Sequence, residues 1–234
     1  MGLSQKEIQI MKIDGINVYK SQINQHINKR QQKISYIVIH DTSNYSVGAN
    51  GAAHVKYFNT TDRKASADFL IDEVGIYQIN DYKRYFTWHC GDGKGKYGIR
   101  NGNSVGLEIC VNKDGNYQAS VNNTIILTAY LMQELGISFD NVVRHYDASR
   151  KLCPSSMVAD NWAKWHRFKQ ALQDYLKLQK FNRSIDFVPI SYKGKSQLIA
   201  THLDRGFNYV SLRALCSFLG YKVTYKDGIV YLDD

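Results

Sequence analysis

The sequence predicts an α/β protein in which helices flank a mixed central sheet, followed by a small α+β domain at the carboxyl end. Two short apolar runs, residues 36–39 and 104–112, are expected to be buried strands, because they are rich in β-branched and aliphatic residues and carry few charges. Between and after these runs the apolar residues recur at helical spacing. Such alternation of strands and helices is typical of an α/β core.

The elements of the first half are expected in a simple order. The polar opening stretch is expected to form a short helix or an irregular lead-in to the strand that ends at His40. A helix with Asn50 as its N-cap comes next, and residues 67–80 are typical of a β-hairpin. Five glycines lie within residues 88–103, which are therefore expected to form a surface loop.

Two helices complete the core of the larger domain. The first is expected to begin at Asn122 and to end at Gly136. The second follows Pro154 and runs to about Gln179. Its apolar stripe comprises Trp162, Trp165, Leu172, Tyr175 and Leu176.

A change of pattern after the long helix divides the chain into a larger domain, residues 1–178, and a small domain, residues 179–234. The small domain is expected to contain two strands, a helix over residues 211–219 and a closing hairpin at Asp227-Gly228. About fifty residues bury little core on their own, so this domain is expected to lean on the larger one or to form a homodimer with a second copy.

Composition and charge limit the functional classes. The hydrophobic fraction of 44% is that of a folded protein. No run approaches the ~20 apolar residues that span a bilayer, and the N-terminus lacks a secretory signal, so we expect no membrane insertion and a cytoplasmic location until release. The net charge of +9 predicts attraction to polyanions, including anionic wall polymers. It is spread over both domains with no dense basic arm, so nucleic acid is not an expected partner.

Three residues together suggest a metal site. His40 ends a predicted strand, and His145 and Cys153 lie eight positions apart in the stretch VVRHYDASRKLCPSS, residues 142–156. Two imidazoles and one thiolate, with a fourth position left for water, form the pattern of a catalytic zinc site. The soft thiolate argues against magnesium or calcium. The residues alone leave the alternative open that the histidines are buried and hydrogen-bonded to the backbone, and that the cysteine is a small core residue.

Two charged residues are candidates for the chemistry at such a site. Glu108 is a carboxylate within an apolar strand, where burial would raise its pKa toward the range of a general base. Lys151 lies two residues before Cys153, where its charge could stabilise an oxyanion. The alternatives are a solvent-facing glutamate and an ordinary solvated lysine.

Three stretches resemble a known family: YIVIHDTSN, WHCGDGKGKYGIRNGNSVGLEICVN and VVRHYDASRKLCP. Together they resemble the zinc-dependent N-acetylmuramoyl-L-alanine amidases, the group that includes amidase-type phage lysozymes and peptidoglycan recognition proteins, over roughly residues 34–175. The resemblance implies a zinc site at one end of the sheet. Its three expected ligands are His40, His145 and Cys153.

The resemblance also implies roles for other residues. Glu108 matches the acidic residue that activates water, and Lys151 matches the basic residue just ahead of the cysteine. The residues that match the lining of the substrate groove are His54, Trp88 and His89. Where some members have a tyrosine followed by a histidine, this chain has Ala67 and Asp68, which places more weight on Glu108.

The function implied by the resemblance is that of an endolysin, a peptidoglycan hydrolase. It would cleave the amide bond between N-acetylmuramic acid and L-alanine in Gram-positive cell walls. The alternative is a non-catalytic peptidoglycan-binding recognition protein, a class that typically lacks the cysteine ligand. Residues 208–232 resemble the repeat of the N-terminal domain of copper amine oxidases, without a copper cluster. This second resemblance implies a module for wall targeting or self-association.

Overall fold

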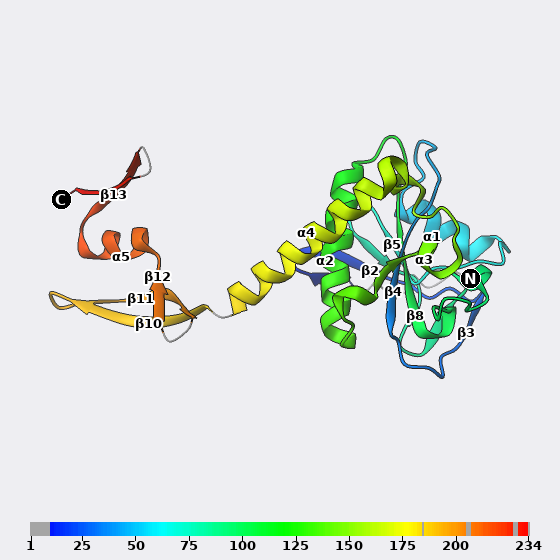
Figure 1. Ribbon diagram of the computed structural model, residues 1–234, viewed down its shortest axis with the longest axis horizontal. Coiled ribbons are helices and arrows are strands. Elements are labelled where there is room, and N and C mark those ends of the chain that lie inside the picture. The colour runs from blue at the N-terminus through cyan, green and yellow to red at the C-terminus, as the bar shows by residue number, and fades with distance from the viewer. Residues whose placement is uncertain (1–9, 184, 205–206, 227–228, 234) are drawn as a thin grey trace, which may run out of the picture. The chain divides into compact units, whose positions relative to one another are not determined.

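The computed structural model describes residues 10–183, 185–204, 207–226 and 229–233, and within them the chain forms two compact units that divide between Tyr175 and Leu176. The first unit is built on a seven-stranded sheet (Figure 1). In sheet order its strands are β1 (Ile10–Ile13), β2 (Ile16–Lys20), β6 (Ile76–Gln78), β5 (Phe69–Ile71), β8 (Ser104–Ile109), β4 (Tyr36–Asp41) and β9 (Val142–Arg144).

The sheet is mixed, as the sequence predicted. Strands β5, β8, β4 and β9 are parallel to one another, whereas β5 and β6 form the expected antiparallel hairpin. Ile37, Val38 and Ile39 of β4 are fully buried, which is typical of a parallel strand covered on both faces. The register pairs His40 of β4 with Glu108 of β8. Both residues therefore reach the same carboxyl edge of the sheet.

The opening stretch is the main error of the sequence-based fold. It forms no helix in its described part but three strands: β1, β2 and β3 (Ile27–Lys29), the last paired with β7 (Tyr85–Thr87). A tight turn with a left-handed residue at Asp14 joins β1 to β2. Ile13 and Val18 are buried in the core, but many polar residues surround them in the sequence. The alternation of apolar and polar residues that indicates a strand is therefore weak in this stretch.

Helices cover both faces of the sheet. Helix α1 (Gly51–Thr60) is capped by Asn50, whose side chain accepts from the Ala53 amide, as predicted. Helix α2 (Tyr117–Leu135) ends at Gly136 as expected but begins earlier than Asn122, because Asn116 is its N-cap. Helices α2 and α4 lie on one side of the sheet and α1 on the other (Figure 1).

The segments around the carboxyl edge are short. The glycine-rich loop contains two 3₁₀ turns, η1 (Gly91–Gly93) and η2 (Asn101–Asn103). A further turn, η3 (Phe139–Asn141), leads into β9, and α3 (His145–Ser149) and η4 (Ser155–Met157) follow it. Helix α4 (Ala159–Arg183) extends past the expected end at Gln179. It buries Trp165 and Leu172 as predicted.

The second unit is a small α+β structure. Strands β10 (Ile185–Tyr192), β11 (Lys195–Asp204) and β12 (Phe207–Val210) form an antiparallel sheet. Helix α5 (Leu212–Leu219), capped by Ser211, precedes the paired strands β13 (Lys222–Lys226) and β14 (Ile229–Asp233). The predicted turn at Asp227-Gly228 lies outside the described residues. Large apolar side chains stay exposed on this unit, including Leu198 and Leu232.

Candidate active site

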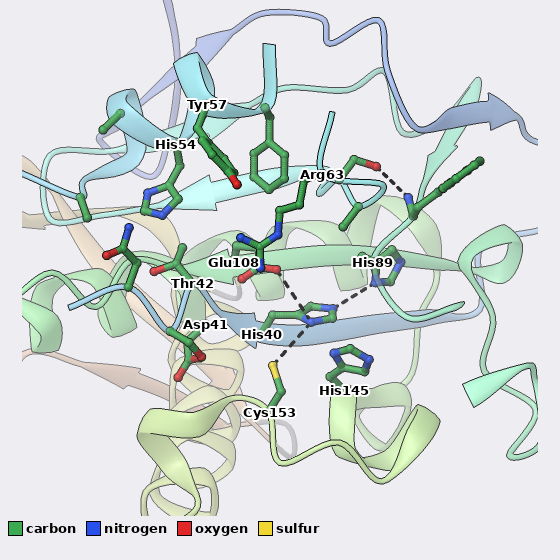
Figure 2. A pocket seen from close by; sticks show the side chains of 18 of the residues that line it. His40, Asp41, Thr42, His54, Tyr57, Arg63, His89, Glu108, His145 and Cys153 are labelled. Carbon is green, nitrogen blue, oxygen red and sulfur yellow. Dashed lines mark hydrogen bonds and ion pairs between the residues drawn. The ribbon is translucent and has the colours of Figure 1, made fainter. Parts of the chain in front are cut away.

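The fold brings the three predicted ligands together. His40 ends β4, His145 begins α3 directly after β9, and Cys153 lies in the loop that follows α3. One ligand atom from each residue lies within 4.8 Å of the others, and all three side chains are buried. They line a cavity of about 560 Å³ (Figure 2).

Hydrogen bonds behind His40 fix which of its ring nitrogens faces this cavity. The Ser104 hydroxyl donates to the Arg100 carbonyl, 2.5 Å away, so it accepts from Nε2 of His89 at 3.0 Å. Nδ1 of His89 is then unprotonated and accepts from Nε2 of His40, also at 3.0 Å. His40 is left with an unprotonated Nδ1, which lies 3.7 Å from the Cys153 sulfur.

His145 is oriented in the same way by a carboxylate. Its Nε2 donates to Oδ1 of Asp92 over 2.8 Å, and the second oxygen of Asp92 accepts from the Ser149 hydroxyl. Gly93 allows this contact, because a Cβ there would lie 2.0 Å from the Ala148 carbonyl oxygen. The Nδ1 of His145 therefore carries a free lone pair. It is buried and has no hydrogen-bond partner within the described residues.

The donor set fits a zinc ion. A buried nitrogen without a partner is costly unless a ligand satisfies it, and His145 Nδ1 faces the two other donors. In tetrahedral zinc sites a nitrogen and a sulfur ligand lie about 3.6 Å apart, from the usual bond lengths. The observed 3.7 Å between His40 Nδ1 and Cys153 Sγ matches this spacing. Carboxylates behind ligating histidines are also typical of such sites.

The loop that carries Cys153 is held by the residue after His40. The buried carboxylate of Asp41 accepts from the Ser155 hydroxyl at 3.0 Å and from the Ser156 amide at 2.6 Å. The Cys153 carbonyl accepts from the amide of Tyr146 in α3. Burial raises the pKa of the Cys153 thiol, as expected for a thiol that ionises only when it binds a cation.

Glu108 lies beside the three donors. Its Oε1 is 4.0 Å from His40 Nδ1, and its Oε2 is buried without a partner among the described residues. Burial, with the negative charge of Asp41, raises its pKa to about 8, while Lys151 and Arg63 act in the opposite direction. A carboxylate with this pKa is suited to take up and return a proton near neutral pH.

Cations line the mouth of the cavity. Lys151 is exposed and lines it, as its predicted role requires. Arg63 was not predicted; it is exposed, lies over the Tyr57 ring and points toward Glu108 (Figure 2). Both positive charges favour an anionic group bound in the cavity.

The three predicted substrate contacts all line the cavity, in different ways. Trp88 is 40% exposed and donates its indole N–H to Asn28. His54 donates Nδ1–H to the Asn50 carbonyl, which leaves Nε2 as an acceptor. His89 is buried with both ring nitrogens engaged within the protein. A polar contact of His89 with substrate would require one of these bonds to break, and the position of its ring favours a role in orienting His40.

Besides Arg63, the sequence prediction missed three residues that build the site: Asp41, Asp92 and Ser104. Asp92 is the one acidic residue in the loop of residues 88–103, which contains three basic residues. This isolated acidic residue could have been recognised in the sequence as a candidate site residue. Asp41 directly follows a predicted ligand, and Ser104 begins a predicted strand. Neither position has a pattern that distinguishes a structural polar residue from a site residue.

The site and the fold define a class of protein. An open set of two histidines and one cysteine, with a buried carboxylate beside it, lies at the carboxyl edge of a mixed α/β sheet. This is the arrangement of a hydrolytic centre. The chain belongs to the N-acetylmuramoyl-L-alanine amidase family, whose model matches residues 30–156, more than half of the sequence.

Relatives and solved structures support this assignment. N-acetylmuramoyl-L-alanine amidase XlyA of Bacillus subtilis strain 168 is 40% identical over 130 residues, which cover 54% of this chain and 41% of XlyA. The catalytic domain of XlyA and a mutant endolysin from Bacillus subtilis each align with a TM-score of 0.58 and 36% identity. Each alignment covers 67% of this chain and 99% of the solved chain. The match thus spans less than half the length of XlyA.

None of the helices in the described ranges combines the length and the apolar character of a membrane-spanning segment.

Proposed function

We propose that this protein is a zinc-dependent N-acetylmuramoyl-L-alanine amidase of the endolysin type, which cleaves the amide bond between N-acetylmuramic acid and L-alanine in Gram-positive peptidoglycan. One observation carries the proposal: the unpartnered Nδ1 of His145 faces His40 and Cys153, with Glu108 beside them. Family membership and the similarity to an endolysin support the same reaction.

The proposed cofactor is Zn²⁺, held by His40, His145 and Cys153. Zinc at this position would supply a Lewis acid for the lactyl carbonyl oxygen and would lower the pKa of a water to about 7. The hydrogen bonds from His40 to His89 and from His145 to Asp92 hold both imidazoles in the tautomer that presents Nδ1. The thiol of Cys153 must lose its proton to complete the set.

Glu108 is the proposed general base and acid. It removes a proton from the attacking water as the oxygen adds to the lactyl carbonyl carbon. Lys151 lines the cavity, where its ammonium group favours the negative charge that develops on the carbonyl oxygen. Glu108 then returns the proton to the nitrogen of L-alanine as the carbon–nitrogen bond breaks. The products are the free glycan carboxyl group and the free stem peptide.

The rim of the cavity is the proposed binding groove for the substrate. Trp88 offers an exposed aromatic face, and His54 offers a ring nitrogen as an acceptor. We propose that these residues contact the sugar and peptide on either side of the scissile bond. We propose that His89 contacts the substrate through the carbon atoms of its ring, because both ring nitrogens are hydrogen-bonded within the protein.

The second candidate function is recognition of peptidoglycan without cleavage. The cavity alone would serve it, but recognition needs neither a buried thiol beside two histidines nor a carboxylate with a raised pKa. For the C-terminal unit we propose wall targeting or self-association. Its small core and the exposure of Leu198 and Leu232 support a surface that binds a partner or a second copy.

The test combines metal content with catalysis. Zinc is measured by elemental analysis in wild type, Cys153→Ser and the control Cys216→Ser, which removes another buried free thiol in the second unit. Release of peptide amino groups from purified Gram-positive walls is assayed in parallel. One zinc per chain with amidase activity is expected for wild type and control, and both should be lost in Cys153→Ser. Metal-free wild type that binds walls and releases nothing would establish recognition instead.

A further inference from the structure

A second cavity, distinct from the proposed active site, opens between strand β3 and the glycine-rich loop. Its volume is about 380 Å³. Three cationic and three amide side chains line it: Lys29, Lys94, Arg100, Gln31, Gln32 and Asn101. We call this cavity the basic pocket. It lacks any acidic side chain among its described lining residues.

The cations of the basic pocket are available for a ligand. Lys29, Lys94 and Arg100 are exposed, and none forms an ion pair with a carboxylate of the described residues. The surrounding segments, residues 28–33 and 91–102, hold six basic residues and a single acidic one, Asp92. The Asp92 carboxylate is already engaged by His145 and Ser149. The charge of the pocket is therefore not neutralised from within the protein.

Glycine residues in the lining keep the pocket open. Three of its lining residues are glycines, at 91, 95 and 102. A Cβ at Gly95 would lie 2.1 Å from the Arg100 side chain, and a Cβ at Gly91 would lie 2.9 Å from the Asn101 amide. Any side chain at either position would push a polar lining group out of place. Gly95 also has a left-handed backbone, with φ of +72°.

The donors indicate the chemistry of the ligand. Two ammonium groups and one guanidinium supply only hydrogen-bond donors and positive charge, and the two glutamine amides each add an NH₂ donor beside an acceptor oxygen. A group with several oxygens on one central atom, such as phosphate, can accept hydrogen bonds from several of these donors at once. Phe86 lines the same pocket and is half-buried, which offers one apolar contact for the carbons of a sugar or polyol. A single aromatic residue does not form the stacking series typical of single-stranded nucleic-acid sites.

The pocket is joined to the proposed active site. Oδ1 of Asn101, on its wall, accepts from the backbone amides of His89 and Cys90. His89 in turn bonds to His40. A polymer bound in the basic pocket would thus keep the proposed active site close to the material to which that polymer is attached.

We propose that the basic pocket binds a phosphodiester unit of an anionic polyol-phosphate polymer attached to the cell wall. This binding site is additional to the proposed amidase reaction. It rests on the proposed function in one respect, that the protein acts at a cell wall, where such a polymer is found.

The test measures binding without hydrolysis, so its failure leaves the amidase proposal untouched. The probe is fluorescently labelled poly(glycerol phosphate), titrated with the 234-residue protein and followed by fluorescence anisotropy. The pocket variant combines Lys29→Gln, Lys94→Gln and Arg100→Gln. The matched control combines Lys56→Gln, Lys113→Gln and Arg167→Gln, three exposed residues outside the pocket that give the same net charge. Thermal unfolding checks that both variants are folded.

The pocket variant is expected to bind the polymer roughly 100-fold more weakly, since each of the three basic residues near an anionic group contributes about fivefold. The control should lose no more than about threefold, because distant exposed charges are screened. Equal losses in both variants, or wild-type affinity in the pocket variant, would overturn the proposal. If the triple variant does not fold, Lys94→Gln alone should weaken binding about fivefold, and an unchanged affinity would count against the pocket.

Nucleic acid provides the competing outcome. Single-stranded DNA of equal length is titrated under the same salt conditions. Tighter binding to DNA than to poly(glycerol phosphate), lost in the pocket variant, would make the pocket a nucleic-acid site and overturn the assignment to a wall polymer. Weaker binding to DNA would support the assignment.

Discussion

Removing the carboxylate of Asp92 should weaken metal binding without direct loss of a ligand. In the folded protein Asp92 accepts the Nε2 proton of His145, whose side chain is 4% exposed. In Asp92→Ala this nitrogen would remain buried without a partner, and the imidazole would be free to rotate or to change tautomer. Nδ1 would then face the other two donors for only part of the time.

The size of the effect follows from the geometry. A 2.8 Å bond between a half-exposed carboxylate and a buried imidazole is a charge-assisted hydrogen bond. Loss of such a partner behind a metal ligand lowers metal affinity about 10- to 100-fold, which corresponds to about 1.4–2.7 kcal/mol. Asp92→Asn keeps an oxygen that can accept the proton but lacks the charge. It should fall between wild type and Asp92→Ala.

The assay is zinc competition against a chelator of known affinity, with wild type, both Asp92 variants and Asp114→Asn. Asp114 is an exposed loop carboxylate that accepts from the Gly48 amide, away from the metal site, and controls for loss of an acidic side chain. Thermal unfolding of the metal-free proteins separates a structural defect from a change in affinity. Zinc affinity of Asp92→Ala within twofold of wild type would refute the role given to this carboxylate.

Three further predictions concern stability. Burial raises the pKa of Glu134, but hydrogen bonds from Lys83 and Tyr82 outweigh it and hold the pKa below its ordinary 4.5. The ionised carboxylate therefore stabilises the folded protein above pH 4.5, and this contribution is lost as the pH falls through the lower pKa of the folded state. Glu134→Gln should therefore cost about 1–2 kcal/mol in urea unfolding at pH 7, and the difference should shrink below about pH 4; a constant difference would contradict this. Gly106→Ala should cost about 1–3 kcal/mol, because its Cβ would lie 2.6 Å from the His89 ring; an unchanged melting temperature would show that the ring moves freely. Asn116→Ala should cost about 1 kcal/mol, measured by denaturant unfolding, since it removes the N-cap of α2, whereas Asn122→Ala should cost less.

The buried strands and the residues that form the His40, His145 and Cys153 cluster were the parts that the sequence predicted best. Residues 36–39 and 104–112 are apolar because parallel strands are covered on both faces, so their pattern is legible without a structure. His40 and Glu108 stand out within those runs because a polar residue in a buried strand needs a reason. Their pairing across β4 and β8 follows from the register.

Other parts could not be predicted, for reasons that are physical. Strands β1 and β2 lie at the edge of the sheet, where few of their residues are buried and the pattern is weak. The start of α2 depends on whether Asn116 or Asn122 caps it, and both residue types cap well. The orientation of each imidazole depends on Ser104 and Asp92, which reach the site through the tertiary fold and not through proximity in the chain.

The distance along the chain between the donors has a consequence for how the protein would acquire the proposed zinc. His40 and Cys153 are 113 residues apart, and nothing short of the assembled sheet brings them within 3.7 Å. An unfolded or half-synthesised chain offers isolated donors that would hold an ion weakly, so the proposed zinc should bind tightly only once the fold is complete. Metal loading should then act as a checkpoint: a chain that retains zinc has already closed β4 against β8 and β9, and chelation should favour the unfolded chain.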